Sequence, residues 1–413
     1  MEKICFVVCQ YGKEVNGGGE LHCKMLAERL TPYFDVDILT SKIINYKTFE
    51  AYYTHAIEIM NGTRILRFDC EPYNPASHKK WLTKAKWPRK IRRNLFRLGL
   101  LRAIANIFPV WNCGIKQEQA LLRTDGFYSP DMLAYLRGNH DDYKTIIFIS
   151  YPFPHTLLGS LIAPEKSILI PTAHDEGDLF RSIQTHVFTG VRHIAFNTEE
   201  ERSLTQNIFG KHLAPSSIVA VGVETEVDTP FSSDKEMREK FNLPNNYIHY
   251  FGRIVKSKLG NLIPWFIDYK RKYPSDLKLV LTGKLFQPKI DHPDIVYTGF
   301  VSMEEKIFLI KNARLVVNPS KNESLSLLQL EAMKLGKTVL VNGKSEVMKG
   351  HCMRSGFAAD YYLSKQDFQQ KVHQYAFDDE LLENNNIKAK NYVDTFYNWD
   401  TIIAKLKAVI DTI

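Results

Sequence analysis

Residues 313–343 read ARLVVNPSKNESLSLLQLEAMKLGKTVLVNG, in which two short apolar runs flank a longer apolar segment. The runs at 313–320 and 337–343 resemble strands that are buried on both faces of a parallel sheet. From Leu325 to Leu335 nearly every residue is apolar on every side of the helix that this segment should form, and such a helix is buried. The stretch therefore predicts a strand–helix–strand unit of an α/β protein.

Two glutamates interrupt this apolar segment. Glu323 opens it and Glu331 lies eight residues further on, about 12 Å along a helix axis. A buried carboxylate needs a partner, and carboxylates accept hydrogen bonds from hydroxyls, so the pair could hold both ends of a nucleotide sugar. The amides near Ser324–Ser326, at the helix N-terminus, would favour its diphosphate. Alternatively, Glu323 caps the helix and Glu331 forms half of a buried ion pair.

The same alternation of apolar runs and helical segments extends through the chain and predicts doubly wound α/β sheets. Further strands are expected at 3–9, 35–40, 64–68, 145–150, 167–170, 193–196, 218–223, 247–252, 277–283 and 294–300. A polar, proline-punctuated stretch at 224–246 indicates a domain boundary. We expect two Rossmann-like domains, 1–228 and 229–397, that face a central cleft, and a C-terminal helix, 398–413, that packs back toward the N-terminal domain.

The composition is typical of a globular protein of two domains, with 413 residues of which 44% are apolar and 24% charged. No apolar run approaches the roughly 18 residues needed to span a bilayer, and the N-terminus lacks a signal-peptide pattern. The six cysteines are scattered without metal-ligand spacing. These features predict a cytoplasmic protein.

Two cations follow the strand expected at 247–252. Arg253 comes directly after it, and Lys258 opens the next helix. Together with the exposed backbone amides expected at Gly252, they suit a leaving diphosphate, whose developing charge they would stabilise. Alternatively, both are solvated surface cations.

Six segments together resemble the retaining glycosyltransferases of family 4, or glycosyltransferases group 1, which have the GT-B fold. They are NGGGELHCKMLAERL (16–30), PTAHDE (171–176), FNTEEER (196–202), FGRIVKSKLG (251–260), TGFVSMEEK (298–306) and NPSKNESLSLLQLEAMKLGKTVLVNG (318–343). They occur in both expected domains and in the family's order, and the last is the most specific.

The resemblance implies a donor-binding set in the C-terminal domain. Its members are Gly252, Arg253, Lys258, Phe300, Val301, Glu323, Ser324, Leu325, Ser326 and Glu331. In that family the two cations bind the donor diphosphate, the first glutamate contacts the sugar and the second holds the ribose hydroxyls. The turn at Phe300 and Val301 meets the nucleobase through its backbone. Ser324 and Ser326 depart from the family, which often has glycine there, so a close backbone approach is less assured.

In the N-terminal domain the resemblance implies two contributions. The glycine loop that includes Gly18 and Gly19 approaches the donor phosphate or the acceptor, and His174 lies near the reacting sugar. Asp175 and Glu176 follow that histidine, and the sequence assigns neither of them a role.

The resemblance also implies the course of the reaction. The acceptor hydroxyl attacks from the side that the diphosphate leaves, the anomeric configuration is retained, and no protein nucleophile is needed. No metal is obligatory. Asp35 and Asp37 imitate the Asp-x-Asp metal motif of another glycosyltransferase fold, but they begin a strand, and we expect no metal there. UDP, GDP and ADP sugars are all candidate donors.

A basic segment, KKWLTKAKWPRKIRRNLFRLGLLRAI at 79–104, lies in a stretch without acids from Pro72 to Ile115. It could be a solvated surface helix. It could bind an anionic membrane surface, because an apolar stripe would be flanked by arginines. That stripe comprises Ile91, Leu95, Leu98 and Leu101, with Arg89, Arg92, Arg93 and Arg97 around it. Nucleic acid is the least favoured partner, because Trp81 and Trp87 interleave with lysines but no nucleic-acid motif accompanies them.

The sequence therefore predicts a sugar transferase that uses a nucleotide-diphosphate sugar and a glycan or lipid-linked acceptor. Its expected product is a bacterial surface polysaccharide or glycolipid, and its expected location is the cytoplasm or the inner face of the membrane. Two alternatives stay open: a nucleotide-sugar epimerase of the same two-domain shape, and a non-catalytic carbohydrate-binding relative.

Overall fold

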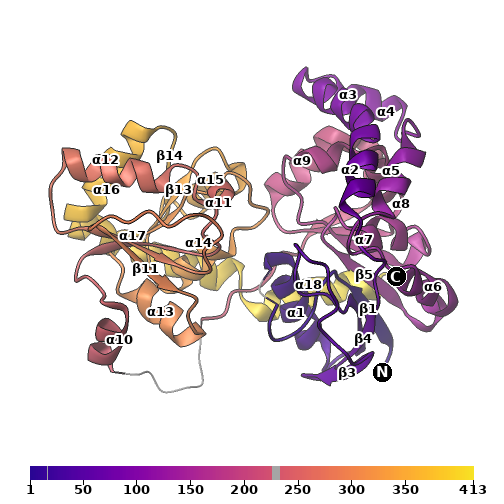
Figure 1. The fold of residues 1–413 in the computed structure, drawn as a ribbon, viewed down its shortest axis with the longest axis horizontal. Coiled ribbons are helices and arrows are strands. Elements are labelled where there is room, and N and C mark those ends of the chain that lie inside the picture. Colours follow the sequence, from indigo (N-terminus) through magenta and orange to yellow (C-terminus); the bar gives the residue numbers. More distant parts are fainter. Residues whose placement is uncertain (16, 226–232) are drawn as a thin grey trace. The chain divides into compact units, whose positions relative to one another are not determined.

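The computed structural model describes residues 1–15, 17–225 and 233–413, and it divides into two compact units (Figure 1). One unit comprises Met1–Val221 with Asp400–Ile413, and the other comprises Gly222–Trp399. The boundary predicted between residues 228 and 229 lies outside the described residues. Each unit has its own sheet and its own apolar core.

The first unit is built on an eight-stranded sheet with the order β3-β4-β2-β1-β5-β6-β7-β8. The strands are β1 (Lys3–Val7), β2 (Asp35–Ser41), β3 (Ile57–Met60), β4 (Thr63–Phe68), β5 (Thr145–Ile149), β6 (Ser167–Ile170), β7 (His193–Phe196) and β8 (Ser216–Ile218). All neighbours pair in parallel except β3 and β4. That hairpin, whose first strand the sequence pattern does not predict, turns at Asn61 and Gly62, both with positive φ.

Helices connect the parallel strands of this unit. They are α1 (Gly18–Leu30), α2 (Pro75–Lys84), α3 (Lys86–Arg97), α4 (Leu101–Ile107), α5 (Ile115–Leu122), α6 (Pro130–Asn139), α7 (Pro154–Gly159), α8 (Ser182–Gly190) and α9 (Glu199–Phe209), with 3-10 turns at His140–Asp142, Pro164–Lys166, Gly177–Phe180 and Gly210–His212. The strand order reverses between β1 and β5, which are neighbours. In open α/β sheets, ligands bind outside the carboxyl ends of strands at such a switch point.

The C-terminal helix α18 (Trp399–Asp411) returns to the first unit, which confirms the packing expected from the sequence. Its apolar face, formed by Ile402, Leu406 and Ile410, is fully buried. Lys407 places its ammonium 5.4 Å from the ring centre of Phe34, and the Arg192 guanidinium lies 3.4 Å from the Thr412 carbonyl oxygen. The chain therefore ends as part of the unit in which it begins.

The second unit contains a six-stranded parallel sheet with the order β11-β10-β9-β12-β13-β14. The strands are β9 (Tyr247–Phe251), β10 (Lys278–Thr282), β11 (Ile295–Gly299), β12 (Leu315–Asn318), β13 (Val339–Asn342) and β14 (Asp360–Tyr362). The helices are α10 (Asp234–Phe241), α11 (Lys256–Leu259), α12 (Leu262–Lys272), α13 (Met303–Lys311), α14 (Leu327–Lys334), α15 (Glu346–Arg354), α16 (Lys365–Phe377) and α17 (Asp379–Phe396). The strand order reverses between β9 and β12, so the residues that follow these two strands occupy a second switch point.

Candidate functional site

The loops after β9 and β10 pack closely against each other. Gly252 and Gly283 have φ values of 139° and 133°, which only glycine adopts readily. The Gly252 amide donates a hydrogen bond of 2.9 Å to the carbonyl of Thr282. A Cβ on Gly283 would lie 1.9 Å from the Gly252 carbonyl oxygen. The backbone that precedes Arg253 is therefore set by contact between two glycine turns.

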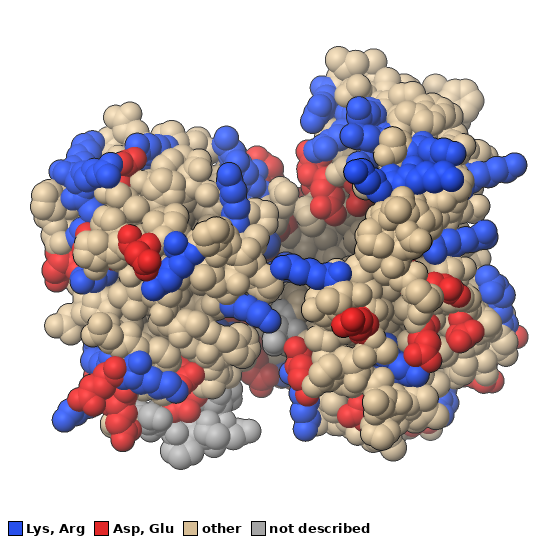
Figure 2. Space-filling model, viewed as in Figure 1, with Lys and Arg blue, Asp and Glu red and all other residues tan. Residues whose placement is uncertain are grey.

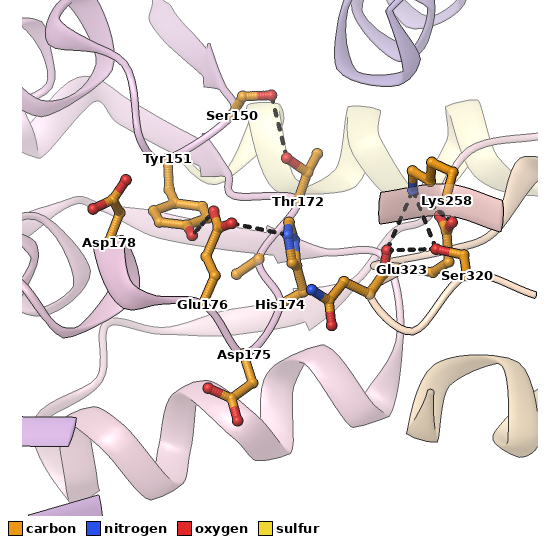
Figure 3. Close-up of polar contacts among 12 residues, drawn as sticks. Ser150, Tyr151, Thr172, His174, Asp175, Glu176, Asp178, Lys258, Ser320 and Glu323 are labelled. Atoms are coloured by element: carbon orange, nitrogen blue, oxygen red, sulfur yellow. Dashed lines mark hydrogen bonds and ion pairs between the residues drawn. The ribbon is translucent and has the colours of Figure 1, made fainter. Parts of the chain in front are cut away.

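Lys258 and Glu323 form an ion pair at this switch point (Figure 3). The Lys258 ammonium lies 2.7 Å from Glu323 Oε1, and it also donates to Ser320 Oγ at 3.4 Å and to the Asn322 carbonyl at 3.3 Å. The two side chains keep 30% and 19% of their surface exposed, respectively. The predicted pair of residues, distant in sequence, is thus brought together in the structure, and both charges can be reached from solvent.

Arg253, the other predicted cation, is exposed. Its carbonyl oxygen accepts a hydrogen bond of 3.0 Å from the Tyr250 hydroxyl, which fixes the turn. Among the residues that the structure describes, no carboxylate forms an ion pair with its guanidinium. The positive charge of Arg253 therefore stays uncompensated by a salt bridge at the carboxyl end of β9.

The segment before α14 differs from the sequence prediction. The helix begins at Leu327, not at Leu325, because Ser326 has φ 66° and ψ 65°, a left-handed conformation that cannot continue a helix. Asn318 Nδ2 donates a hydrogen bond of 3.0 Å to Ser326 Oγ. The Ser326 side chain makes no capping hydrogen bond to the described start of the helix. Ser324 is half-buried and Leu325 is buried.

His351 holds this strained turn in place. Burial lowers the pKa of His351 to about 3, so the ring is neutral. Its Nε2 donates to the Leu325 carbonyl oxygen at 2.8 Å, and its Nδ1 accepts from the Tyr392 hydroxyl at 2.9 Å. Sequence reasoning missed both residues, because they lie on α15 and α17, far from the motif, and no local pattern marks them.

Glu331 forms an ion pair within the second unit. Lys306, on α13, donates to both of its carboxylate oxygens, at 3.0 and 3.1 Å. The side chains are 14% exposed for Glu331 and 21% exposed for Lys306, so the ion pair is partly open to solvent. The structure thus contains the ion pair that the sequence left as an alternative, and Lys306 belongs to the same segment as the expected nucleobase turn.

The expected nucleobase turn connects β11 to α13. Phe300 is exposed and Val301 is half-buried. A capping box begins the helix directly afterwards: Ser302 Oγ accepts from the Glu305 amide at 3.2 Å, and the Ser302 amide donates to Glu305 Oε2 at 2.7 Å. Reciprocal capping fixes the path of the chain that leaves Val301.

In the first unit, the glycine segment forms the start of α1 and not a separate loop. The helix begins at Gly18, so Gly18 and Gly19 lie in its first turn, while Asn16 lies outside the described residues. A Cβ on Gly19 would lie 2.5 Å from Ser150 Oγ, whereas one on Gly18 would meet no atom within 4 Å. Gly19 therefore permits close packing against the end of β5, and Gly18 borders open space.

A buried carboxylate, Glu20, sits in that first turn. It accepts hydrogen bonds from the Tyr46 hydroxyl and, at 2.9 Å, from the Cys9 thiol. Burial and the adjacent carboxylate raise the pKa of the Cys9 thiol well above its usual range, so the thiol stays protonated and donates. Sequence reasoning missed this cluster, because its members come from three separate segments.

His174 follows β6 and lies against Glu176 (Figure 3). Its Nε2 is 3.2 Å from Glu176 Oε2, and Glu176 Oε1 accepts a hydrogen bond from the Tyr151 hydroxyl. The neighbouring turns are tied by a contact of 3.2 Å between the hydroxyls of Ser150 and Thr172, both residues with positive φ. His174 thus stands at the carboxyl edge of the sheet, next to residues that follow β5.

Glu201, from the FNTEEER segment, supports the turn that carries His174. It is fully buried on α9 and accepts hydrogen bonds from the Ala173 amide and, at 2.7 Å, from the Asn197 amide. Burial raises the pKa of Glu201 to about 8, although the backbone donors oppose this shift. Its role is to satisfy backbone amides beneath the turn.

The structure of the basic segment, residues 79–104, shows that the predicted apolar stripe is only partly exposed. Leu101 is fully buried and Leu95 packs against the core, so only Ile91 and Leu98 of that stripe are exposed. Arg92 is also buried, with its guanidinium 5.4 Å from the ring centre of Trp111. Other apolar side chains near α4 are exposed instead, namely Leu100, Ile107, Phe108 and Val110.

Two arginines of α3 face the turn that follows His174. Arg93 pairs with Asp175 at 3.4 Å and Arg89 pairs with Asp178 at 2.6 Å. Figure 2 shows that lysine and arginine side chains gather over the part of the first unit formed by α3 and α4. The basic segment is therefore anchored to the candidate site by its arginines, while most of its lysines face solvent.

Within the described ranges, no cluster of three His, Cys, Asp or Glu residues could hold a metal ion, and no helix is long and apolar enough to cross a membrane. Asp37, in the sequence that imitates a metal motif, accepts hydrogen bonds from Arg64 Nε at 2.8 Å and from the Tyr143 hydroxyl at 2.7 Å. Its carboxylate serves the packing of β2.

Comparison with known proteins confirms the resemblance and the fold. Residues 233–392 match the family model described as glycosyl transferases group 1. A sucrose-phosphate synthase from Thermosynechococcus elongatus superposes with a TM-score of 0.69 at 12% identity, over 100% of this chain and 99% of that one. The HepE protein of Anabaena, in complex with UDP and glucose, gives 0.68 at 14% identity over 100% of both chains. Trehalose-6-phosphate synthase OtsA gives 0.69 at 8% identity over 100% of this chain and 99% of that one. No curated protein sequence matches the chain.

Proposed function

We propose, from the premise that residues 233–392 form a group 1 glycosyltransferase domain, that the protein transfers a sugar from a nucleotide-diphosphate sugar to a hydroxyl of a glycan or glycolipid. The observation that carries this proposal is the Lys258–Glu323 ion pair beside Arg253 at the β9/β12 switch point. Two cations and one carboxylate are placed where open α/β sheets bind ligands, and none of them is sealed from solvent.

Arg253 and Lys258 are the proposed binding residues for the donor diphosphate. Within the described part of the chain, the Arg253 guanidinium has no salt bridge and the Lys258 ammonium has one carboxylate partner, so together they offer an anion a net charge of +1. As the sugar leaves, negative charge grows on the diphosphate, and preorganised cations stabilise it without rearranging. Once phosphate oxygens approach Lys258, the Glu323 carboxylate can accept hydrogen bonds from hydroxyls of the donor sugar.

The remaining donor contacts are assigned to the segments that surround this pair. Glu331 accepts hydrogen bonds from the ribose hydroxyls, and Lys306 continues to neutralise its charge. The backbone of Phe300 and Val301 contacts the nucleobase. The amides of Ser324–Ser326 are assigned to the phosphates, whereas the Gly252 amide is already bonded to the Thr282 carbonyl, which leaves Gly252 to shape the turn before Arg253. The uncapped start of α14 supports this assignment, because helix N-termini without a side-chain cap favour anions.

For the reaction itself, we propose retention of configuration without an obligatory metal. The acceptor hydroxyl attacks from the side that the diphosphate leaves, and the diphosphate takes the proton. The two cations supply the charge stabilisation that a metal would otherwise provide. His174 contacts the reacting sugar. Gly18 and Gly19 allow the donor phosphate or the acceptor to approach the start of α1 closely.

The first donor to test is a UDP sugar. HepE, whose structure contains UDP and glucose, supports this choice as a relative in fold, while GDP and ADP sugars stay as candidates. We expect the nucleotide that raises the melting temperature most in a thermal-shift screen to identify the donor class, because a ligand that binds only the native state stabilises it.

The decisive experiment is donor turnover by Arg253→Ala/Lys258→Ala. We expect the double variant to lose both sugar transfer and the slow hydrolysis of the donor, while its melting temperature stays within a few degrees of that of the wild type, because both cations are partly solvated. Near-normal transfer by a folded double variant would refute the assignment. A wild-type protein that binds the donor but releases no nucleotide would support the carbohydrate-binding alternative, and release of an epimerised nucleotide sugar would support the epimerase.

We further propose that the acceptor is lipid-linked, in the synthesis of a bacterial surface polysaccharide or glycolipid, and that residues 79–104 approach an anionic membrane. Exposed apolar side chains flank α4, with Leu98 70% and Ile107 72% exposed, in a stretch that contains no acid. The same segment carries exposed cations, namely Lys84, Lys86, Lys90, Arg97 and Arg102. Apolar anchors with cations around them are what binds a peripheral protein to anionic lipid.

Vesicle flotation tests this surface. We expect the wild type to float with vesicles of phosphatidylcholine and phosphatidylglycerol but not with phosphatidylcholine alone. Leu98→Ser/Ile107→Ser and Arg97→Glu should each weaken the flotation. Ile387→Ser, which removes an exposed apolar side chain from the second unit, is the matched control. Equal flotation of all variants would exclude this part of the proposal.

A further inference from the structure

A half-buried carboxylate, Glu176, lies beside His174, and the proposed function gives it no task. It belongs to the same turn, and its amide donates a hydrogen bond of 2.7 Å to the His174 carbonyl oxygen. Its Oε2 is 3.2 Å from His174 Nε2. Figure 3 draws this contact as a dashed line. The two residues are thus linked through backbone and side chain at once, which restricts the imidazole to a narrow range of orientations.

The opposite side of this carboxylate is held by Tyr151. The tyrosine is buried at the end of β5, its amide donates to the Pro171 carbonyl at 3.0 Å, and its own carbonyl accepts from Gln184 Nε2 at 3.4 Å. Burial and the charge of Glu176 raise the pKa of Tyr151 well above its usual range. The hydroxyl therefore stays protonated and donates to Glu176 Oε1.

The charge on Glu176 follows from these contacts. Burial alone would raise the pKa of Glu176, but the hydrogen bonds with His174 and Tyr151 and the charge of Arg89 outweigh it, and the net shift is downward. Glu176 is therefore an anion at neutral pH. An anion at this distance favours a proton on the imidazole nitrogen that faces it.

We propose that Glu176 is a positioning residue: it holds the imidazole of His174 in one orientation, keeps a proton on its Nε2 and stabilises its charged form, while Tyr151 fixes the carboxylate. The meaning of this device for catalysis rests on the proposed function, in which His174 contacts the reacting sugar. A ring that is already oriented loses little entropy when the sugar binds, which lowers the barrier to transfer.

Other titratable and charged groups surround the turn and form the background against which His174 titrates. Glu201 reaches it from α9 through the Ala173 amide. The remaining charged groups nearby are Asp175 and Asp178 on the turn, Arg89 and Arg93 on α3, and Arg181 before α8. Asp175 points away from His174 in Figure 3 and pairs with Arg93, so it offers a control of equal charge one residue from Glu176.

The test is a titration of the His174 ring by nitrogen NMR in the full-length protein, with the signal assigned by its loss in His174→Gln. We expect the midpoint to fall by about one pH unit in Glu176→Gln, since an opposite charge at this distance is worth that much or more. The Nε2-protonated tautomer should also lose its dominance. Asp175→Asn removes the same charge and should leave both the midpoint and the tautomer near those of the wild type.

Tyr151→Phe provides a second route that removes only a hydroxyl. It should move the midpoint in the same direction as Glu176→Gln, by a smaller amount. In donor turnover, Glu176→Gln should lower kcat about tenfold and leave the donor KM unchanged.

An unchanged midpoint and tautomer in a folded Glu176→Gln, or equal shifts in Glu176→Gln and Asp175→Asn, would overturn the proposal. The NMR titration needs no substrate. Absence of any sugar transfer by the wild type would therefore refute the proposed function. The positioning of His174 would still be decided by the NMR titration.

Discussion

Carboxylates serve different purposes at the two switch points. In the second unit, Glu323 and Glu331 face lysine ammonium groups in partly exposed ion pairs. In the first unit, Glu201 accepts hydrogen bonds from backbone amides, and Glu20 from a hydroxyl and a thiol. Exposed ion pairs cost little to open, so a ligand can replace one partner. Buried carboxylates that hold the backbone cannot be removed without loss of the local fold. The second unit thus has ion pairs that a ligand can open, and the first unit has carboxylates that hold the local fold together.

The sharpest way to test this difference is to remove one member of the exchangeable pair. Lys258→Met should lower kcat/KM for the donor about 10²-fold or more, because it removes a cation from the developing negative charge. The free energy of unfolding should change by about 1 kcal/mol or less, since the pair is partly exposed. Lys240→Met breaks an ion pair with Glu305 in the same unit and should leave turnover unchanged. If the loss in unfolding free energy were as large as the loss in kcat/KM expressed as a free energy, Lys258 would have a structural role.

The opposite result is expected for Glu201→Gln in the first unit. A glutamine offers one acceptor where the carboxylate now meets two amides, so one buried donor loses its partner at a cost of about 1–3 kcal/mol. Urea unfolding measures this cost. Glu199→Gln, an exposed position on the same helix, is the control and should have little effect.

Glu201 also predicts a pH dependence of stability. Burial raises its pKa to about 8 in the folded protein, from an ordinary value of 4.5. The folded state then binds a proton that the unfolded state has released, so the contribution of this group is fully present below pH 4.5 and is lost as the pH rises toward 8. The slope of unfolding free energy against pH over this range should be shallower in Glu201→Gln. Equal slopes would show that Glu201 stays ionised.

An intermediate case is Glu331, whose ion pair is the less exposed of the two. Glu331→Gln should raise the donor KM about tenfold with kcat nearly unchanged, because ribose contacts bind the ground state and the transition state alike. Lys306→Met should have a smaller effect on KM. If both variants lost stability and neither changed KM, the pair would be structural, as the alternative reading of the sequence holds.

The smallest effects are expected at the start of α1. Gly18→Ala meets no atom within 4 Å and should stabilise the protein by up to about 1 kcal/mol, the difference in helix propensity. Gly19→Ala would place its Cβ 2.5 Å from Ser150 Oγ and should destabilise it slightly. If Gly18 borders bound phosphate or acceptor, Gly18→Ala should reduce transfer despite its greater stability. Unimpaired transfer would remove Gly18 from the proposed site.

The sequence predicted well those elements whose residues are neighbours along the chain. Most strands of both sheets follow from continuous apolar runs, whereas the donor-binding set is what the resemblance to a family implies and stays a prediction. The pattern did not predict β14 or β3, whose Ile57 and Ile59 are exposed at a sheet edge. It placed a strand at 218–223 where β8 ends at Ile218, and it did not predict the late start of α14 at Leu327. It also placed Leu95 and Leu101 on an exposed stripe, although both pack inward. The spacing of apolar residues along a helix does not by itself show which of its faces the rest of the fold covers.

By itself the sequence determined the class of fold and the residue types that we propose face the donor, because apolar periodicity and residue identity are properties of the chain. Only the tertiary structure decided which charges are paired. Lys258 meets Glu323 and Lys306 meets Glu331 across separations of 65 and 25 residues, and Tyr151 meets Glu176 from a neighbouring strand. Such contacts depend on how the parallel strands are ordered in the sheet, which sets the side chains that share an edge, and no local spacing encodes that order.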